Sequence, residues 1–253
     1  MKRIGLLGCG AIGSIIARHK ASVEITALYD GIPERRERLA TMLGDTRLHT
    51  NFNSFIRDEF DIVVEAASIG AVEDYGQAIL KQGKDLIILS VGALADTALK
   101  QGLEKLAVSL ARKIRIPSGA LFGLDNLKIG RVSRFDTLTL RTTKPPASLG
   151  EAVNQKTLLF KGSAQQGIRL YPRNVNVAVA LSLAAERPVD MELWADPDAT
   201  RNTHEVIVSG DFGEAAITVQ NVPSPDNPAT SYLAALSILT LLDDLDRPLL
   251  IGT

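Results

Sequence analysis

Apolar residues in the first part of the chain form short runs, separated by longer stretches with helical spacing. The runs at 62–64 and 86–89 hold only Ile, Val and Leu, as strands covered on both faces do. We predict strands at Arg3–Leu7, Glu24–Tyr29, Ile62–Glu65, Asp85–Leu89 and Ile114–Ile116. Helices are predicted near Ala11–Lys20, Glu34–Leu43, Val72–Lys81 and Leu94–Ala111. This alternation indicates βαβ units and a doubly wound, parallel α/β sheet of the Rossmann type.

The pattern changes after Pro117-Ser118-Gly119. Polar and apolar residues now alternate with a period of two, as in strands with one solvent-facing side, which are usually antiparallel. The alternation occupies Arg134–Arg141 and parts of Asp190–Trp194, His204–Ser209 and Ala215–Val222. Two helical stretches are predicted, at about Leu158–Tyr171 and Val175–Glu186. We therefore expect a second α+β domain that binds substrate and mediates dimerisation.

The last predicted helix begins at Asn227-Pro228, an N-cap followed by proline at the first helical position. It runs through Leu239 and is too apolar to lie on an open surface, so we expect it to pack on the first domain. Residues 1–117 with 227–253 are then predicted to form a dinucleotide-binding domain, and residues 118–226 a substrate-binding and catalytic domain.

Charge and composition narrow the classes of partner. The 253 residues include 28 basic and 29 acidic side chains, so the global field that attracts nucleic acids or membrane surfaces is missing. No apolar run reaches the roughly 20 residues that cross a bilayer, and the chain starts directly with a strand, so we expect a cytoplasmic protein. One cysteine and three scattered histidines do not form a familiar zinc site, and no metal is expected.

The motif Gly8-Cys9-Gly10-Ala11-Ile12-Gly13 follows a predicted strand and opens a predicted helix. In a dinucleotide-binding turn, Gly8 permits the tight bend, Gly10 lets the backbone approach the pyrophosphate, and Gly13 allows close helix–strand contact. The helix amino terminus, with Ala11 and Ile12, then faces the phosphates. The alternative is a glycine turn that binds nothing.

Asp30 follows the second predicted strand, where an acidic side chain accepts hydrogen bonds from the adenosine ribose and favours NAD. Arg35 and Arg36 come soon after it and could pair with the 2′-phosphate of NADP. Alternatively, Asp30 caps the next helix and both arginines are solvated. Ala67, in a small-residue turn after the third strand, is a candidate contact of the nicotinamide ribose, although such turns are more often ordinary connections.

From these residues onward the sequence resembles the L-aspartate dehydrogenases, a family related in architecture to homoserine dehydrogenase and dihydrodipicolinate reductase. The resemblance covers essentially the whole chain. Its more specific motifs are Pro117-Ser118-Gly119-Ala120, Phe160-Lys161-Gly162-Ser163-Ala164, Pro172-Arg173-Asn174-Val175-Asn176-Val177-Ala178, Ala195-Asp196-Pro197, Asn202-Thr203-His204-Glu205 and Asn227-Pro228-Ala229-Thr230-Ser231. Gly167 departs from the family pattern, which has alanine there, and is expected to loosen its helix.

The resemblance implies oxidation of L-aspartate to iminoaspartate with NAD or NADP. The imine would then hydrolyse to oxaloacetate and ammonia or feed the synthesis of NAD. It also implies that Ala120 and Asn176 contact the dinucleotide and that His204 is the catalytic residue.

The residues themselves leave more open. His204 is the only histidine in the second half and titrates near neutrality, as proton transfer in amine oxidation requires, but a structural role remains equally open. Asn176 lies in the first turn of a predicted helix, where it could bind the nicotinamide carboxamide or simply cap the helix. Two substrate carboxylates need positive partners. The spacing does not choose among the candidates, which are Lys144, Lys161, Arg169 and Arg173.

Two other functions share the nucleotide-binding features. One is an NAD(P)-dependent reductase or dehydrogenase of another small acidic substrate, and the other is a module that senses NAD(H) without turnover. A sugar oxidoreductase fits less well, because Val91-Gly92-Ala93 stands where that family has Glu-Lys-Pro. An open face or edge of the second sheet would suit a two-fold partner, and we expect a homodimer.

Overall fold

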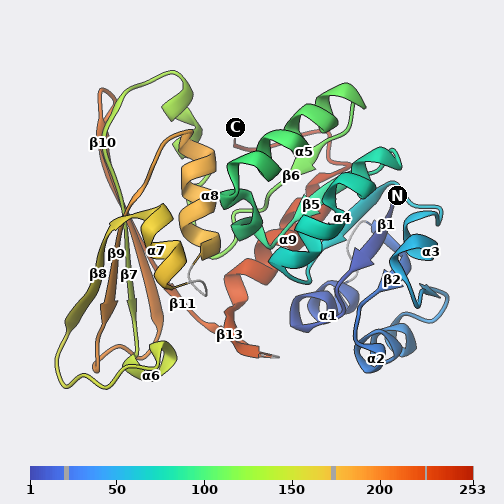
Figure 1. The fold of residues 1–253 in the computed structure, drawn as a ribbon, viewed down its shortest axis with the longest axis horizontal. Helices are drawn as coiled ribbons and strands as arrows, with labels where there is room; N and C mark the ends of the chain where they lie inside the picture. Colours follow the sequence, from blue (N-terminus) through green and yellow to red (C-terminus); the bar gives the residue numbers. More distant parts are fainter. Residues whose placement is uncertain (20–22, 172–174, 226, 253) are drawn as a thin grey trace. The chain divides into compact units, whose positions relative to one another are not determined.

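The computed structural model describes residues 1–19, 23–171, 175–225 and 227–252 (Figure 1). The chain divides into two compact units. Unit 1 comprises Met1–Pro117 and Ala235–Leu250, and unit 2 comprises Ser118–Ala234 and Ile251–Thr253. The chain thus returns to unit 1 later than the predicted residue 227.

Unit 1 is built on six parallel strands in the order β3-β2-β1-β4-β5-β6. The strands are β1 (Lys2–Leu7), β2 (Val23–Tyr29), β3 (Arg47–Leu48), β4 (Ile62–Glu65), β5 (Asp85–Ile88) and β6 (Ile114–Arg115). The chain winds outward from β1 to β3 and then returns to β4 on the other side of β1. The predicted doubly wound sheet is confirmed, and its strand order reverses between β1 and β4, where such folds bind ligands.

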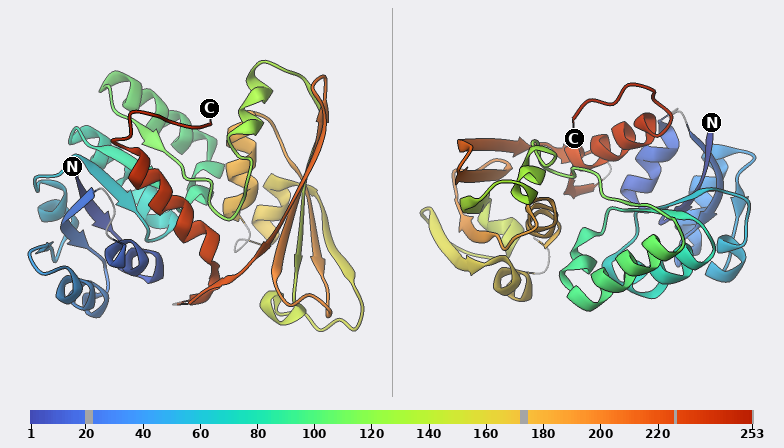
Figure 2. Two further views of the ribbon diagram at one scale, coloured as in Figure 1. Left: turned by 180° about the vertical axis from the view of Figure 1, so that it is seen from behind. Right: turned by 90° about the horizontal axis from the view of Figure 1, so that it is seen from above.

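Helices flank the strands of unit 1 (Figure 1). They are α1 (Ala11–Arg18), α2 (Pro33–Leu43), α3 (Phe52–Ile56), α4 (Ile69–Lys81), the 3₁₀ helix η1 (Val91–Ala95), α5 (Thr97–Ser109) and, from the end of the chain, α9 (Tyr232–Asp244). Ala235, Ile238 and Leu242 of α9 are buried in one cluster with Ile4 of β1 and Val64 of β4. Figure 2 shows α9, in red, lying along the strands of unit 1, as its apolar sequence predicted.

The predicted start of the last helix at Asn227-Pro228 is wrong. Asn227–Ser231 forms strand β13, which pairs antiparallel with β12 (Pro223–Ser224), and the helix begins at Tyr232. The Asn227 side chain donates to Thr230 Oγ1 at 3.1 Å inside this strand. Pairing with β12 uses the backbone groups that a helix would have needed, so it overrides the local capping signal.

Unit 2 contains a five-stranded sheet in the order β11-β10-β7-β9-β8. Its strands are β7 (Phe135–Lys144), β8 (Thr157–Ser163), β9 (Asp190–Ala195), β10 (Asn202–Gly210) and β11 (Gly213–Asn221). The β7–β9 pair is parallel and the other pairs are antiparallel, so the sheet is mixed. The inward residues of the alternating strands, Leu138, Leu140, Val206 and Val208 among them, form one core with Leu181 of α8 (Val175–Ala185). Short helices are η2 (Asn126–Arg131), α6 (Pro146–Leu149) and α7 (Ala164–Leu170).

The single helix predicted over Leu158–Tyr171 is also wrong. Its first half is strand β8, and only Ala164–Leu170 is helical. Ser163 and Gln166 form a reciprocal capping box at the boundary, a signal already present in the sequence. Gly167 has a packing role in this helix, because a Cβ there would lie 2.7 Å from Met191 Sδ. The glycine therefore permits close contact of α7 with β9.

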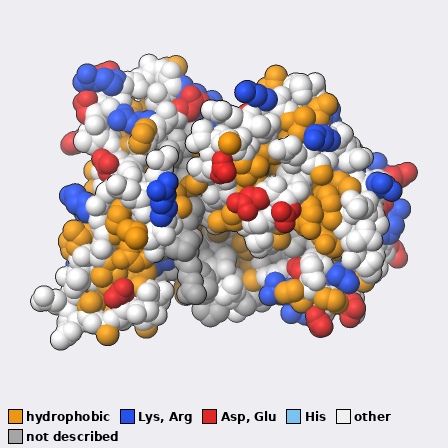
Figure 3. Space-filling model, viewed as in Figure 1, with side chains coloured by type: hydrophobic (Ala, Val, Ile, Leu, Met, Phe, Trp, Pro, Cys, Tyr) orange, Lys and Arg blue, Asp and Glu red, His pale blue; other side chains and the backbone are white. Residues whose placement is uncertain are grey.

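Acidic and basic side chains are interspersed over the face shown in Figure 3, in keeping with the net charge of −1. Among the described residues, no helix has the length and apolar character needed to cross a membrane.

Candidate functional site

The glycine motif forms the turn between the carboxyl end of β1 and the amino end of α1. Gly8 has φ +106°, and a Cβ there would lie 2.6 Å from the Ala66 carbonyl group. A Cβ on Gly13 would lie 2.3 Å from the carbonyl oxygen of Gly8. Backbone geometry alone therefore requires glycine at both positions, with or without a ligand.

Gly10 differs from its two neighbours. Its φ is −76°, and a Cβ added there would meet no atom within 4 Å. The protein's own packing therefore does not require glycine, whereas a ligand in the open space would. The amide groups of Ala11, Ile12 and Gly13 open α1, where N–H groups lack intrahelical acceptors and favour an anion. This turn fits the pyrophosphate of a dinucleotide.

Asp30 links the end of β2 to the glycine turn. Its buried carboxylate accepts from Cys9 N at 2.7 Å and from Ile32 N at 2.8 Å. The Cys9 side chain is itself buried, and burial together with the charge of Asp30 raises the pKa of its thiol to about 12. Cys9 is therefore a protonated packing residue at neutral pH.

The arginines after Asp30 lie in different environments. Arg36 is buried and its Nη1 donates to the Asp30 carbonyl oxygen at 2.8 Å, so this guanidinium supports the turn. Arg35 is exposed. Arg38, which the sequence analysis did not single out, extends its Nη2 to 3.4 Å from the Cys9 carbonyl oxygen. Arg35 and Arg38 are thus the better placed of the three to meet a 2′-phosphate.

Glu65, at the end of β4, was not recognised from the sequence as a site residue. It is fully buried, and its Oε1 accepts from Ala67 N (2.8 Å), Ser68 N (2.9 Å) and Ser90 Oγ (2.8 Å). Its Oε2 accepts from Leu89 N (3.2 Å) and Ser90 N (2.9 Å). The candidate residue Ala67 is exposed, and its amide is used by Glu65.

His204 lies on β10 in unit 2, with 7 % of its surface exposed. Its Nδ1 is 3.0 Å from Thr142 Oγ1, on the neighbouring strand β7. Burial, and secondly the charge of Lys144, lower the pKa of His204 to about 4. The imidazole is therefore neutral at pH 7 and able to accept a proton.

Lys144, at the end of β7, stands out among the basic candidates for substrate binding. Burial lowers its pKa, and the structure gives it no carboxylate partner among the described residues. Lys161 instead pairs with Glu192 at 3.0 Å, and Arg169 is exposed on α7. Arg173 lies outside the described residues. Lys144 is thus the candidate that shares its surroundings with His204.

Ala120 and Asn176 also belong to unit 2. The Ala120 carbonyl oxygen accepts from Asn221 Nδ2 at 3.3 Å, and Asn221 pairs with Asn202 at the start of β10. Ala120 therefore lies near the end of the sheet that carries His204. Asn176 is exposed in the first turn of α8.

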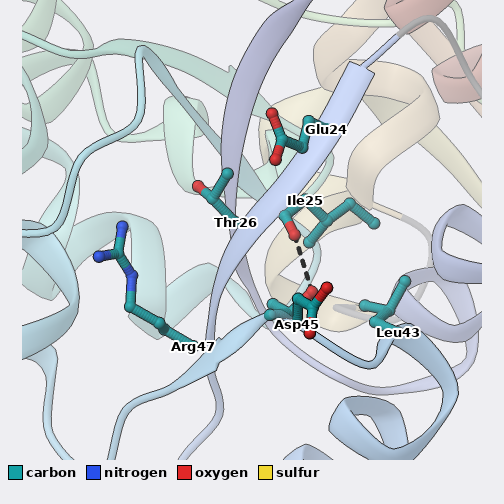
Figure 4. A pocket seen from close by; sticks show the side chains of 7 residues that line it. Glu24, Ile25, Thr26, Leu43, Asp45 and Arg47 are labelled. Atoms are coloured by element: carbon teal, nitrogen blue, oxygen red, sulfur yellow. Dashed lines mark hydrogen bonds between the residues drawn. The ribbon is translucent and has the colours of Figure 1, made fainter.

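A surface hollow of unit 1 contains none of the predicted site residues. It is lined by Glu24, Ile25, Thr26, Leu43, Asp45, Thr46 and Arg47 (Figure 4). Thr46 Oγ1 donates to the Ile25 carbonyl oxygen at 2.8 Å inside it (Figure 4). Because it lies at the amino end of β2, it faces away from the edge that carries Asp30 and the glycine turn. No group of three or more potential metal ligands occurs in the described part of the chain.

Comparison with known proteins agrees with this geometry. Residues 125–245 match the family model described as aspartate dehydrogenase, C-terminal, and residues 8–117 match homoserine dehydrogenase, NAD binding domain. The chain is 56% identical to the L-aspartate dehydrogenase of Methanospirillum hungatei, over 100% of both chains. The chain belongs to the L-aspartate dehydrogenase family. The resemblance noted in the sequence is confirmed.

Other relatives agree with this assignment. The L-aspartate dehydrogenase of Methanothermobacter thermautotrophicus is 43% identical over 99% of this chain and 98% of its own. The crystal structure of aspartate dehydrogenase from Thermotoga maritima superposes with a TM-score of 0.83 and 28% identity, covering 100% of both chains. A scyllo-inositol dehydrogenase from Lactobacillus casei, solved with NAD(H), shares only the fold, with 12% identity, a TM-score of 0.59 and coverage of 96% and 87%.

Substituting Gly10 separates ligand binding from folding. Gly10→Ala should fold with a Tm close to that of the unchanged protein, because its Cβ enters open space. It should weaken NAD binding by about tenfold or more, because the Cβ blocks close approach of the pyrophosphate. Calorimetric titration with NAD and a thermal melt measure the two effects.

Gly13→Ala is the contrasting variant, and it should lower the Tm because its Cβ meets the Gly8 carbonyl. An NAD affinity that is unchanged in Gly10→Ala would contradict binding of the pyrophosphate at this turn.

Proposed function

We propose that this chain oxidises L-aspartate to iminoaspartate with NAD or NADP. The observation that carries the proposal is a buried neutral histidine beside a lysine without a carboxylate partner among the described residues, in a chain that also carries a dinucleotide-binding turn. Unit 1 would bind the dinucleotide and unit 2 the amino acid. When bound, the nicotinamide accepts the hydride that leaves Cα of the substrate.

His204 is the proposed base. The substrate ammonium must lose a proton before its nitrogen can form a double bond to Cα as the hydride leaves. A proton on His204 Nδ1 donated to Thr142 Oγ1 leaves Nε2 with a free lone pair to take the ammonium proton. Water that attacks the resulting imine would release oxaloacetate and ammonia.

Lys144 is the proposed partner of a substrate carboxylate. A partly buried ammonium is stabilised by a negative partner, and an amino acid with two carboxylates supplies one. The carboxylate would also offset the charge that lowers the pKa of His204. Substrate binding would therefore strengthen the base that deprotonates it.

The dinucleotide contacts remain those expected from the sequence and the family. The glycine turn, from Gly8 to Gly13, would hold the pyrophosphate, and Asp30 would accept from the adenosine ribose. Ala67 would contact the nicotinamide ribose, Asn176 the nicotinamide carboxamide, and Ala120 the dinucleotide. A role in the synthesis of NAD and a cytoplasmic location complete the proposal.

His204→Ala tests the assigned chemistry. Purified protein with L-aspartate and NAD or NADP should accumulate reduced nicotinamide, measured by absorbance, and the variant should lose at least about 100-fold in kcat. Its affinity for NAD should stay nearly intact, because His204 acts on the substrate.

Two outcomes would contradict this assignment. A fully active variant would remove His204 from the mechanism. Binding of NAD without turnover of L-aspartate by the unchanged protein would favour another small acidic substrate or a sensing module.

Lys144→Met tests the carboxylate partner. Losing a charged hydrogen bond costs about 1.5–3 kcal/mol, so KM for L-aspartate should rise by about 10-fold to 100-fold. Removal of the lysine charge also raises the pKa of His204, so the acidic limb of the kcat/KM profile should move to higher pH. The matched control is Arg169→Met, which removes an exposed charge. A rise in KM in the control alone would transfer the role to Arg169.

We also propose a homodimer formed through the sheet face of unit 2 opposite its core. This face carries a network of ion pairs within the chain, in which Arg141 Nε lies 2.8 Å from Glu192 Oε2 and Nη1 lies 3.5 Å from Glu205 Oε2. Ile207 lies on the same face, because Val206 and Val208 point into the core. A second copy of this chain would cover these side chains.

Light scattering tests the assembly. The unchanged protein should show twice the chain mass of 27.2 kDa, and Ile207→Lys should show the chain mass, because a buried ammonium opposes association. Leu170→Lys, at an exposed apolar residue of α7, is the matched control and should remain dimeric. A monomeric unchanged protein would contradict the proposal.

A further inference from the structure

Glu65 is a fully buried acidic residue to which the proposed reaction gives no role. Five donors converge on its two oxygens, from the turn after β4 and the turn after β5. A buried carboxylate of this kind is not needed to join two turns, since backbone and water hydrogen bonds do so elsewhere.

The donor set favours the ionised form of Glu65. Four of the five donors are backbone amides, which cannot reverse their direction to accept a proton. Burial raises the pKa of Glu65, and the hydrogen bonds from Ser90, Ala67 and Ser68 oppose that rise. Among the five donors, Ser90 Oγ alone could instead accept a proton from Glu65, whereas the four amides all favour the carboxylate. The geometry thus holds a negative charge inside unit 1.

The strand order places the Glu65 carboxylate on the side of the glycine turn where the nicotinamide half of a dinucleotide would lie. β2 and β4 flank β1 on opposite sides, so Asp30 and Glu65 lie on opposite sides of the glycine turn. The Ala66 and Ala67 backbone lies against Gly8, as the 2.6 Å and 2.7 Å approaches to its Cβ position show. With the pyrophosphate at the turn and the adenosine ribose at Asp30, the nicotinamide half extends over β4 and β5.

We propose that Glu65 determines the redox preference of the cofactor site by favouring the oxidised nicotinamide over the reduced one. The oxidised ring carries a positive charge that the reduced ring lacks, and the rest of the two dinucleotides is the same. A fixed negative charge screened from water attracts only the oxidised form. The preference suits an enzyme that begins by binding the oxidised cofactor. The proposal rests on the proposed function only in assuming that unit 1 binds NAD(P).

Glu65→Gln tests the charge in a side chain of the same shape. Calorimetric titration gives Kd for NAD⁺ and for NADH in both proteins. The ratio Kd(NADH)/Kd(NAD⁺) should fall by on the order of tenfold in the variant, the effect of one charge at intermediate dielectric and nanometre range. Ser90→Ala is the matched control, because it removes one donor to Glu65 and keeps the charge. Its ratio should match that of the unchanged protein.

An unchanged ratio in Glu65→Gln would overturn the proposal and leave Glu65 as an anchor of the two turns. Equal shifts of the ratio in Glu65→Gln and Ser90→Ala would also overturn it, because the second variant keeps the charge.

A second measurement uses only the unchanged protein, so it tests the proposal even if Glu65→Gln fails to fold. The unchanged protein is titrated with NAD⁺ and with the dinucleotide in which benzamide replaces nicotinamide, which has nearly the same shape and no ring charge. NAD⁺ should bind more tightly by several-fold. Equal affinities would overturn the role of Glu65 and leave the proposed function standing. Failure of both dinucleotides to bind would contradict the proposed function itself.

Discussion

The turn after β1 is fixed between two other segments of unit 1, the end of β2 and the backbone that follows β4. Gly8 N donates to the Tyr29 carbonyl oxygen at 2.8 Å, and Cys9 N donates to the Asp30 carboxylate at 2.7 Å. From the other side, the Ala66 backbone occupies the position that a Cβ of Gly8 would need. The turn is therefore preorganised before any nucleotide arrives. That order lowers the entropy lost on binding and leaves the first amides of α1 directed at an anion.

The two units differ in how the protein compensates charged side chains that are wholly or partly buried. In unit 1, Asp30 and Glu65 have their oxygens occupied by backbone amides, so the protein itself compensates these charges. In unit 2, the structure gives Lys144 no such compensation among the described residues, and its charge acts on His204. These hydrogen bonds hold both carboxylates at fixed positions, from which the charge of Glu65 can still act on a cationic ring nearby. A charge left without a partner costs free energy until a ligand supplies one, which is why it marks a binding site better than burial alone.

The sequence predicted the parts of the molecule that depend on local pattern. The central strands β4 and β5 are buried and were visible as unbroken apolar runs. The glycine turn follows from three glycines at set spacing. The errors lie where pairing between distant segments decides the structure. The sequence of β8 predicted a helix, but the segment forms a strand because it pairs with β9. Asn227-Pro228 predicted a helix start, but these residues pair with β12 instead. For the same reason Glu65 was missed, and Lys144 could not be separated from the other basic candidates. The roles of both residues depend on neighbours from other strands and loops.

The protonation state of His204 also depends on neighbours from distant segments, which the sequence alone does not show. Its residue type suggests proton transfer, yet an exposed histidine would be partly protonated near neutrality. The register of β10 against β7 turns it inward beside Thr142, and burial keeps it neutral. The same burial makes it a weak base, with a pKa of about 4, so it needs help to deprotonate an ammonium. A substrate carboxylate at Lys144 would provide part of that help by offsetting the lysine charge, the smaller of the two causes that lower the pKa of His204. Acid–base strength and substrate recognition would then be coupled, because an amine without a correctly placed carboxylate would meet a weaker base.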